Sequence, residues 1–133
     1  MATIKAYTDI SQSKKLAEIL PLESADMAYI KHSSSDNPTW EFNEDFPPMI
    51  LGNVPINEMT VEVLPCWSLA ALLSVLPEIN SIPLKVEKVK AEDGYNGYYY
   101  HIEYEDILLI PYSKNPVDAC YQMVIKLKEN NLI

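Results

Sequence analysis

The residues best suited to nucleophilic chemistry in this sequence are Cys66 and His101. Cys66 follows Pro65 and opens an apolar stretch that ends at Pro77. It is therefore expected near the N-terminus of a helix, where the helix dipole lowers a thiol pKa. A thiolate at Cys66 with His101 as its base would outline a small hydrolase or transferase. The alternative is a buried thiol that packs as a small hydrophobic side chain. Because no recognised motif surrounds Cys66, we predict no catalytic residue.

A second candidate set could bind a metal ion. His101, Glu103 and Glu105 occur at every second position, so a strand would project all three side chains from one face. Imidazole and carboxylate groups are common metal ligands. The alternative is that these polar residues face water while the alternating tyrosines face the core. Since the chain has no C-x-x-C pair and its three glycines form no nucleotide-binding motif, we predict neither a metal nor a cofactor.

Aromatic residues are the most prominent candidates for a binding function. The chain has nine tyrosines and two tryptophans, and aromatic rings give a protein interface large contact area at low entropic cost. The predicted partner-binding residues are Trp40, Phe42 and Phe46, together with Trp67. Their alternative role is to close the open side of the hydrophobic core.

The charge of the chain argues against direct nucleic-acid binding. Its net charge is −9, its ten basic residues are all lysines, and none lies between Lys31 and Lys85. Nucleic-acid binding needs a basic surface, usually with arginine. The acidic residues at positions 36–62 could instead imitate a phosphate backbone, which would make the protein a DNA-mimic inhibitor. Acidic proteins also use such charge simply for solubility.

Length and hydropathy predict one cytoplasmic domain over residues 1–133. No apolar run reaches the roughly 18 residues that a membrane-spanning helix needs. The N-terminal segment MATIKAYTDISQSKK lacks the apolar region of a signal peptide. In a reducing compartment, Cys66 and Cys120 are expected to be free, buried thiols.

The first half of the chain predicts a helix and a few short strands. Asp9 and Gln12 form a capping box that begins a helix over residues 10–20, which Pro21 ends. Short strands are expected at residues 25–32 and 59–64, and residues 39–48 are expected to form an edge strand or an irregular flap.

A central helix is expected between Pro65 and Pro77. Its leucines at positions 69, 72, 73 and 76 have the spacing of one helix face, and Trp67 and two alanines make the other side apolar. A helix that is apolar nearly all round must be covered on both flanks, by its own domain or by a partner.

The second half predicts three strands and a final helix. The strands are expected at residues 84–90, 98–104 and 107–112. Asp93-Gly94 and Asn96-Gly97 both favour a hairpin turn between the first two. In the final helix, Asn115 is the expected N-cap, followed by Pro116, with a stripe at residues 117, 120, 121, 124 and 127 facing the core.

These elements predict an α+β, two-layer fold. We expect an antiparallel sheet that combines the three-stranded C-terminal meander with one or two short strands. About three helices are expected to pack on one face of this sheet.

Three blocks of the sequence resemble a group of short, uncharacterised proteins of gut Bacteroidales genomes and their prophages. The blocks are YTDISQSKKLAEILPLESADM, CWSLAALLSVLP and NPVDACYQMVIKLKENNL. The resemblance implies a small soluble protein associated with mobile elements, and it implies no catalytic residue or ligand.

Taken together, these patterns predict a small, non-enzymatic, intracellular protein that binds another protein or itself. The predicted partners include neither nucleic acid nor a membrane. A cysteine–histidine hydrolase or transferase and an acidic DNA mimic are the alternatives.

Overall fold

The computed structural model describes residues 5–32, 39–45, 51–56, 59–76, 85–90, 98–104 and 108–133. The chain divides into two compact units, one formed by Tyr7–Ala71 and the other by Met1–Ala6 with Leu72–Ile133. Each unit contains its own antiparallel sheet. The single domain predicted over residues 1–133 stays a prediction.

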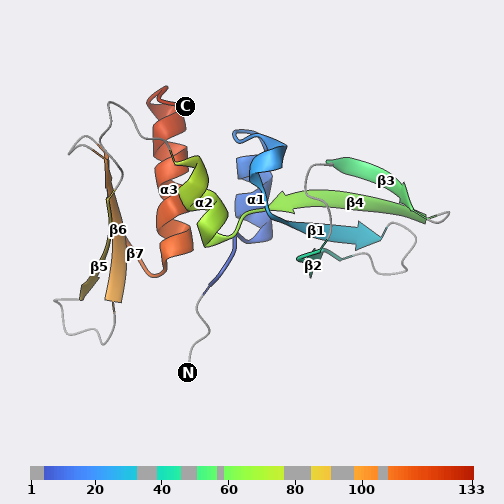
Figure 1. Cartoon of the computed structure of the whole chain (residues 1–133), viewed down its shortest axis with the longest axis horizontal. Coiled ribbons are helices and arrows are strands. Elements are labelled where there is room, and N and C mark those ends of the chain that lie inside the picture. The colour runs from blue at the N-terminus through green and yellow to red at the C-terminus, as the bar shows by residue number, and fades with distance from the viewer. Residues whose placement is uncertain are drawn as a thin grey trace. The chain divides into compact units, whose positions relative to one another are not determined.

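The unit Tyr7–Ala71 is built on a four-stranded antiparallel sheet (Figure 1). Its strands are β1 (Met27–His32), β2 (Glu41–Asn43), β3 (Gly52–Ile56) and β4 (Met59–Cys66). Their order in the sheet is β2-β1-β4-β3, so β1 and β4 lie at the centre and β2 and β3 lie at the edges.

The two faces of this sheet carry different residues, because side chains alternate along a strand. One face carries an aliphatic cluster of buried side chains from β1 and β4. The members of that cluster are Ala28, Ile30, Val61 and Val63. The opposite face carries Tyr29, Leu64 and Cys66, and the side chains of Tyr7, Ile10, Met27 and Trp40 pack against them. This second face is the one that holds the candidate site.

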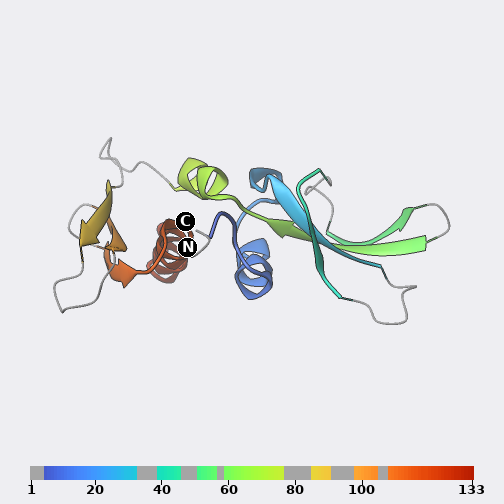
Figure 2. The same cartoon turned by 90° about the horizontal axis from the view of Figure 1, so that it is seen from below.

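Helix α1 (Ile10–Ala17) packs against β4 (Figure 2). Its predicted capping box is confirmed: the Gln12 backbone N–H donates to the Asp9 carboxylate at 2.8 Å, and the Asp9 N–H donates to Gln12 Oε1 at 3.1 Å. The helix ends at Ala17, slightly before the predicted residue 20, and a 3-10 turn follows at Leu22–Ser24.

Proline positions explain two differences between the predicted and observed strands. No strand was predicted where β3 lies, because Gly52 and Pro55 are of residue types that are rare in strands. Pro55 is tolerated because β3 is an edge strand. Strand β4 was expected to end at residue 64 but continues through Pro65 to Cys66. Since β3 pairs with β4 only as far as Val63, the missing N–H of Pro65 costs no bond to β3.

The central helix is shorter than expected, because β4 takes up its predicted first turn. Helix α2 covers Leu69–Val75, and Ser68 caps it by accepting a 3.2 Å hydrogen bond from the Ala71 N–H. Leu72 is completely buried, but Leu73 is 45% exposed. The described part of the chain therefore covers α2 only in part, on the side of Leu72.

The second unit contains a three-stranded meander and the last helix (Figure 1). Its strands are β5 (Lys85–Lys90), β6 (Tyr98–Tyr104) and β7 (Leu108–Ser113), in the order β5-β6-β7. All three confirm predicted strands to within about two residues. The predicted turn residues 93–97 lie outside the described part of the chain.

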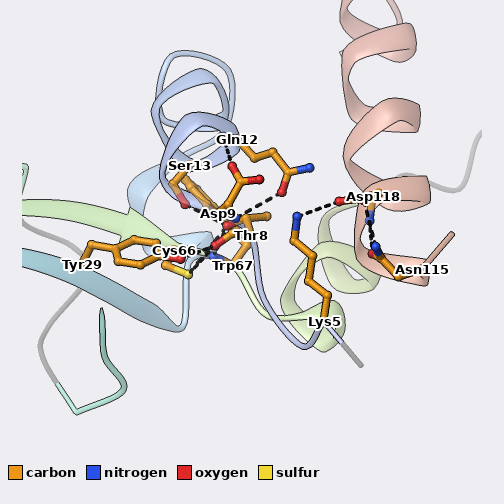
Figure 3. Close-up of polar contacts among 10 residues, drawn as sticks. All are labelled: Lys5, Thr8, Asp9, Gln12, Ser13, Tyr29, Cys66, Trp67, Asn115 and Asp118. Carbon is orange, nitrogen blue, oxygen red and sulfur yellow. Dashed lines mark hydrogen bonds and ion pairs between the residues drawn. The ribbon is translucent and has the colours of Figure 1, made fainter. Parts of the chain in front are cut away.

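Helix α3 (Pro116–Glu129) packs against β6 and β7 and buries one face of apolar side chains. Its N-terminus is confirmed, since the Asp118 N–H donates to Asn115 Oδ1 at 2.8 Å. Lys5 Nζ lies 2.7 Å from Asp118 Oδ1 and so ties the N-terminal segment to this helix end (Figure 3). At the other end, Asn131 adopts a positive φ of 57° and closes the helix in a Schellman motif.

The α+β class is confirmed. The strands, however, form two sheets instead of one, with α1 on the first and α3 on the second. Hydrophobic periodicity locates strands, but it does not specify which strands pair with each other. No helix in the described ranges is long and apolar enough to cross a membrane.

Candidate partner-binding surface

The N-terminal segment of the first unit is fixed to the end of β4. Tyr7 forms an isolated antiparallel bridge with Ser68, and the Thr8 N–H donates to the carbonyl of Trp67 at 2.9 Å. The Trp67 N–H donates in return to the Thr8 hydroxyl at 3.2 Å (Figure 3). These contacts determine where the ring of Tyr7 lies.

The Thr8 hydroxyl is the centre of a buried polar network (Figure 3). Besides accepting from Trp67, it lies 2.9 Å from the Ser13 hydroxyl and donates to Cys66 Sγ at 3.7 Å. A hydroxyl has one donor and two acceptor positions, so these three contacts saturate it when Ser13 is the donor. Thr8, Ser13 and Cys66 are all buried, and a satisfied network of this kind holds the segment rigidly.

Tyr29 connects this network to the aromatic rings on the sheet. Its hydroxyl donates to the carbonyl of Thr8 at 2.7 Å. Burial raises the pKa of Tyr29 well above its usual range, and nearby Cys66 adds to the increase. The phenol therefore stays protonated and keeps donating this hydrogen bond across the ordinary pH range.

Three rings from separate parts of the chain meet on this face. Tyr7 and Phe42 are stacked, with ring centroids 4.1 Å apart and an angle of 2° between their planes. Tyr29 meets both rings edge-on, at 6.4 Å from Tyr7 and 6.0 Å from Phe42. Both stacked and edge-to-face arrangements are favourable geometries for aromatic pairs.

A cation lies over the fourth ring of the group. Lys31 Nζ is 4.8 Å from the centroid of the Trp40 ring and 3.7 Å from a carboxylate oxygen of Glu62. Lys31 and Glu62 are opposite each other in the β1–β4 register. The cation therefore interacts with both an aromatic face and a carboxylate.

Tyr7, Trp40 and Phe42 make up what we call the aromatic surface. Phe42 is 37% exposed, and Tyr7 and Trp40 are partly exposed. Since Tyr7 covers one face of the Phe42 ring, the exposed part of Phe42 belongs to its other face and its edge. The surface thus combines fixed rings with accessible area.

The predicted partner-binding residues are divided by the structure. Trp40 and Phe42 lie on the aromatic surface, and Phe46 lies outside the described residues. Trp67 is 0% exposed, and its indole N–H donates to Ser24 Oγ at 2.9 Å. Trp67 is therefore part of the core and is left out of the surface.

Next to Trp67, an acidic side chain positions the start of α2. The Ser68 N–H donates to Asp26 Oδ1 at 2.9 Å, and the Ser68 hydroxyl donates to Asp26 Oδ2. The same hydroxyl caps α2, so Asp26 joins the start of β1 to the start of this helix.

The structure does not support the alternative of an activated thiol at Cys66, and the expected place of Cys66 near a helix N-terminus is wrong. Cys66 is the last residue of β4, not the first turn of a helix, and it is completely buried. Burial raises the pKa of the Cys66 thiol, although its hydrogen bond with Thr8 opposes the increase. Its thiol also donates to the Thr8 carbonyl at 3.4 Å. A nucleophilic cysteine needs the opposite conditions, namely access and a lowered pKa.

The possible metal ligands lie largely outside the described structure. The backbones of His101 and Glu103 belong to β6, whereas their side chains and the whole of Glu105 are not described. Within the described ranges, no three His, Cys, Asp or Glu side chains gather in a way that could hold a metal ion.

Cys66 and Cys120 are free, buried thiols, as predicted. Burial raises the pKa of Cys120 to about 12.

Because the native state keeps the protons of the two thiols and the unfolded state loses them near pH 8.5, stability should fall as the pH rises above that value. We expect a slope of up to about 1.4 kcal/mol per pH unit for each thiol. Urea unfolding at pH 8 and pH 10 would measure this change of the unfolding free energy with pH. Cys120→Ala should remove the part of the slope that comes from Cys120. Rapid alkylation of either thiol in the native protein at pH 8 would contradict this account.

Comparison with protein-family models, curated proteins and solved structures found no match. The function must therefore be argued from the residues themselves.

Sequence reasoning did not identify Tyr7 as part of the aromatic surface, or Lys31 as the cation next to it. Tyr7 lies before the first helix and Lys31 near the end of a strand, and neither position carries a motif. Both reach the surface only through pairing with residues more than thirty positions away, Ser68 and Glu62. The capped helix start at Asp9 was visible in the sequence, but the bridge that places Tyr7 was not.

Proposed function

We propose that this protein is a small, non-enzymatic binding protein that engages a protein partner through its aromatic surface. The observation that carries the proposal is the partly exposed Phe42 ring, stacked on Tyr7 and supported by Tyr29. Following the sequence resemblance, we further propose that it acts inside the cell in the context of a mobile element or prophage.

Exposed, well-supported aromatic rings are typical of the residues that dominate binding energy at protein interfaces. Binding normally costs free energy to immobilise the side chains that make contact. Here the Phe42 ring is already held by two neighbours, and Tyr7 is fixed through the Thr8 network. The surface is therefore pre-organised, which reduces that cost.

The properties of Cys66 support a non-enzymatic function. Its thiol is buried, its pKa is raised, and its hydrogen bonds with Thr8 stabilise the fold. The catalytic alternative from the sequence thus loses its nucleophile.

The acidic residues give less support to DNA mimicry. Glu41, Glu44 and Asp45 are exposed, but Glu62 pairs with Lys31, and Trp40 and Phe42 interrupt the series. A mimic needs a regular row of unpaired carboxylates.

The test is a comparison of two variants that each remove an exposed apolar side chain. Phe42→Ser should weaken partner binding about 30-fold, the effect expected of a residue that contributes about 2 kcal/mol. The free energy of unfolding of the Phe42→Ser variant should fall by about 1–3 kcal/mol, because the ring pairs with Tyr7 and Tyr29 are both lost. Partners would be recovered from the native cytosol, identified by native mass spectrometry, purified and titrated by calorimetry.

Leu51→Ser is the matched control. Leu51 is 52% exposed in the same unit, so its replacement changes surface hydrophobicity without touching the aromatic surface. Binding should be unchanged in this variant. Equal loss of binding in both variants, or no partner whose binding depends on Phe42, would reject the proposal.

A further inference from the structure

Strand β2 is an open edge of the four-stranded sheet (Figure 1). It pairs with β1 on one side, and no described strand pairs with it on the other. An edge strand directs the N–H and C=O groups of alternate residues away from its sheet, where another strand can pair with them. The opposite edge, β3, contains Pro55, which has no N–H to donate. Strand β2 contains no proline and carries the exposed ring of Phe42, so it is the edge better suited to a partner strand.

The sequence of β2 is compatible with pairing to a second copy of itself. When two copies of one strand pair antiparallel about a twofold axis, the central residue faces itself and its two neighbours face each other. A register centred on Phe42 places the two Phe42 side chains next to each other. It also places Glu41 of each copy opposite Asn43 of the other. Directly opposite residues project from the same face of the sheet with Cβ atoms about 4.5–5.5 Å apart, so these pairs come into contact.

Glu41 and Asn43 are chemically complementary in this register. Asn43 Oδ1 already accepts from the Asp45 N–H at 2.9 Å, and no described residue accepts from the Asn43 NH2 group. That group can therefore donate to the exposed Glu41 carboxylate of the other copy in a charge-assisted hydrogen bond. A register centred on Glu41 would instead bring two carboxylates together, which is unfavourable. A register centred on Asn43 would separate the two Phe42 rings.

We propose that two copies of this chain associate through their β2 strands, in the register centred on Phe42. The inference rests on the proposed function and specifies that the partner is a second copy. Pairing joins the two sheets edge to edge, satisfies backbone groups of β2 and covers the exposed part of Phe42. Because β2 has three residues, few hydrogen bonds form between the strands and the dimer is weak.

Analytical ultracentrifugation of the whole chain, from roughly 10 µM to 1 mM, measures this association. Each chain has a net charge of −9, so two copies repel each other. Raising the salt concentration from about 0.05 M to about 0.5 M screens this repulsion and should strengthen the dimer. Phe42→Ser should raise the dissociation constant of the dimer more than about tenfold. Leu51→Ser, which changes an exposed leucine in the same unit, should leave it unchanged.

Two substitutions of Asn43 have opposite expected effects. Asn43→Lys places a cation opposite Glu41 in both pairs of the dimer and should lower its dissociation constant about five- to tenfold. Asn43→Asp places two carboxylates opposite each other and should raise the constant by a similar factor. Gln122→Lys and Gln122→Glu make the same changes of net charge at an exposed position on α3 and should change it less than about twofold. Equal changes at the two positions would overturn the inference.

Disulfide trapping tests the register directly. A mixture of Glu41→Cys chains and Asn43→Cys chains should cross-link under mild oxidation, because opposite residues have Cα atoms about 4.5–5.5 Å apart. Either variant alone should cross-link poorly, since equivalent positions of the two copies lie about 8 Å apart. Native Cys66 and Cys120 are buried and do not compete. Cross-linking of either variant alone as efficiently as the mixture would contradict the register.

Other outcomes identify which proposal has failed. If the chain stays monomeric at every protein and salt concentration while another protein binds it in a way that depends on Phe42, the inference is overturned and the proposed function stands. A dimer that Phe42→Ser does not weaken also overturns the inference. If neither a second copy nor another protein shows binding that depends on Phe42, both proposals are rejected.

Discussion

Trp67→Ala is expected to reduce the free energy of unfolding by about 3–5 kcal/mol, the usual cost of truncating a buried tryptophan. Trp67 is completely buried, and its indole N–H donates to Ser24. Truncation leaves a cavity and removes this hydrogen bond. Since a domain of this kind is stable by roughly 5–15 kcal/mol in total, the variant should unfold at a much lower urea concentration.

Trp40→Ala provides the contrast for this prediction. The two tryptophans were predicted together as partner-binding residues, but only Trp40 lies on the aromatic surface. Trp40→Ala should cost about 1 kcal/mol of stability, because a partly exposed ring loses less buried area. Its effect should instead appear as weaker partner binding. Similar destabilisation by the two changes would contradict the placement of Trp67 in the core.

Thr8→Val is expected to reduce the free energy of unfolding by about 2–4 kcal/mol, although it barely changes the volume of the side chain. Valine cannot accept from the Trp67 N–H or from the Ser13 hydroxyl. A buried donor left without a partner costs about 1–3 kcal/mol. The measurement is the shift of the urea midpoint at an unchanged slope.

Two further variants make this prediction specific to the hydroxyl. Thr8→Ser keeps the hydroxyl and removes only a methyl group, so it should cost about 1 kcal/mol. In a double-mutant cycle, Thr8→Val and Ser13→Ala should show a coupling of about 0.5–3 kcal/mol, because both changes act on one hydrogen bond. Additive effects would show that the two hydroxyls do not interact.

The sequence determined the elements whose signals are local. The capping box of Asp9 and Gln12, the Asn115 cap with Pro116, and the alternating pattern at residues 98–104 each predict a structure that is present. Such signals lie within a few residues of one another, so the chain specifies them without reference to the rest of the fold.

Local signals predicted the wrong structure at Cys66, where pairing between distant strands competed with them. Pro65 and the apolar run after it predict a helix that includes Cys66, but pairing of Cys66 with Met27 keeps that residue in β4. The Ser68 N–H also donates to Asp26, 42 positions earlier, and Ser68 in turn caps α2, which begins at Leu69. Tertiary contacts of this kind override local propensity.

The aromatic surface was only partly determined by the sequence. Composition drew attention to Trp40 and Phe42, but it could not separate them from Trp67, since aromatic residues occur both at interfaces and in cores. The tertiary structure decided the difference. Strand register brought Phe42 beside Tyr29, the Thr8 network brought Tyr7 onto Phe42, and the end of β4 took Trp67 into the core. Exposure depends on which segments cover a residue, and only the folded chain specifies that.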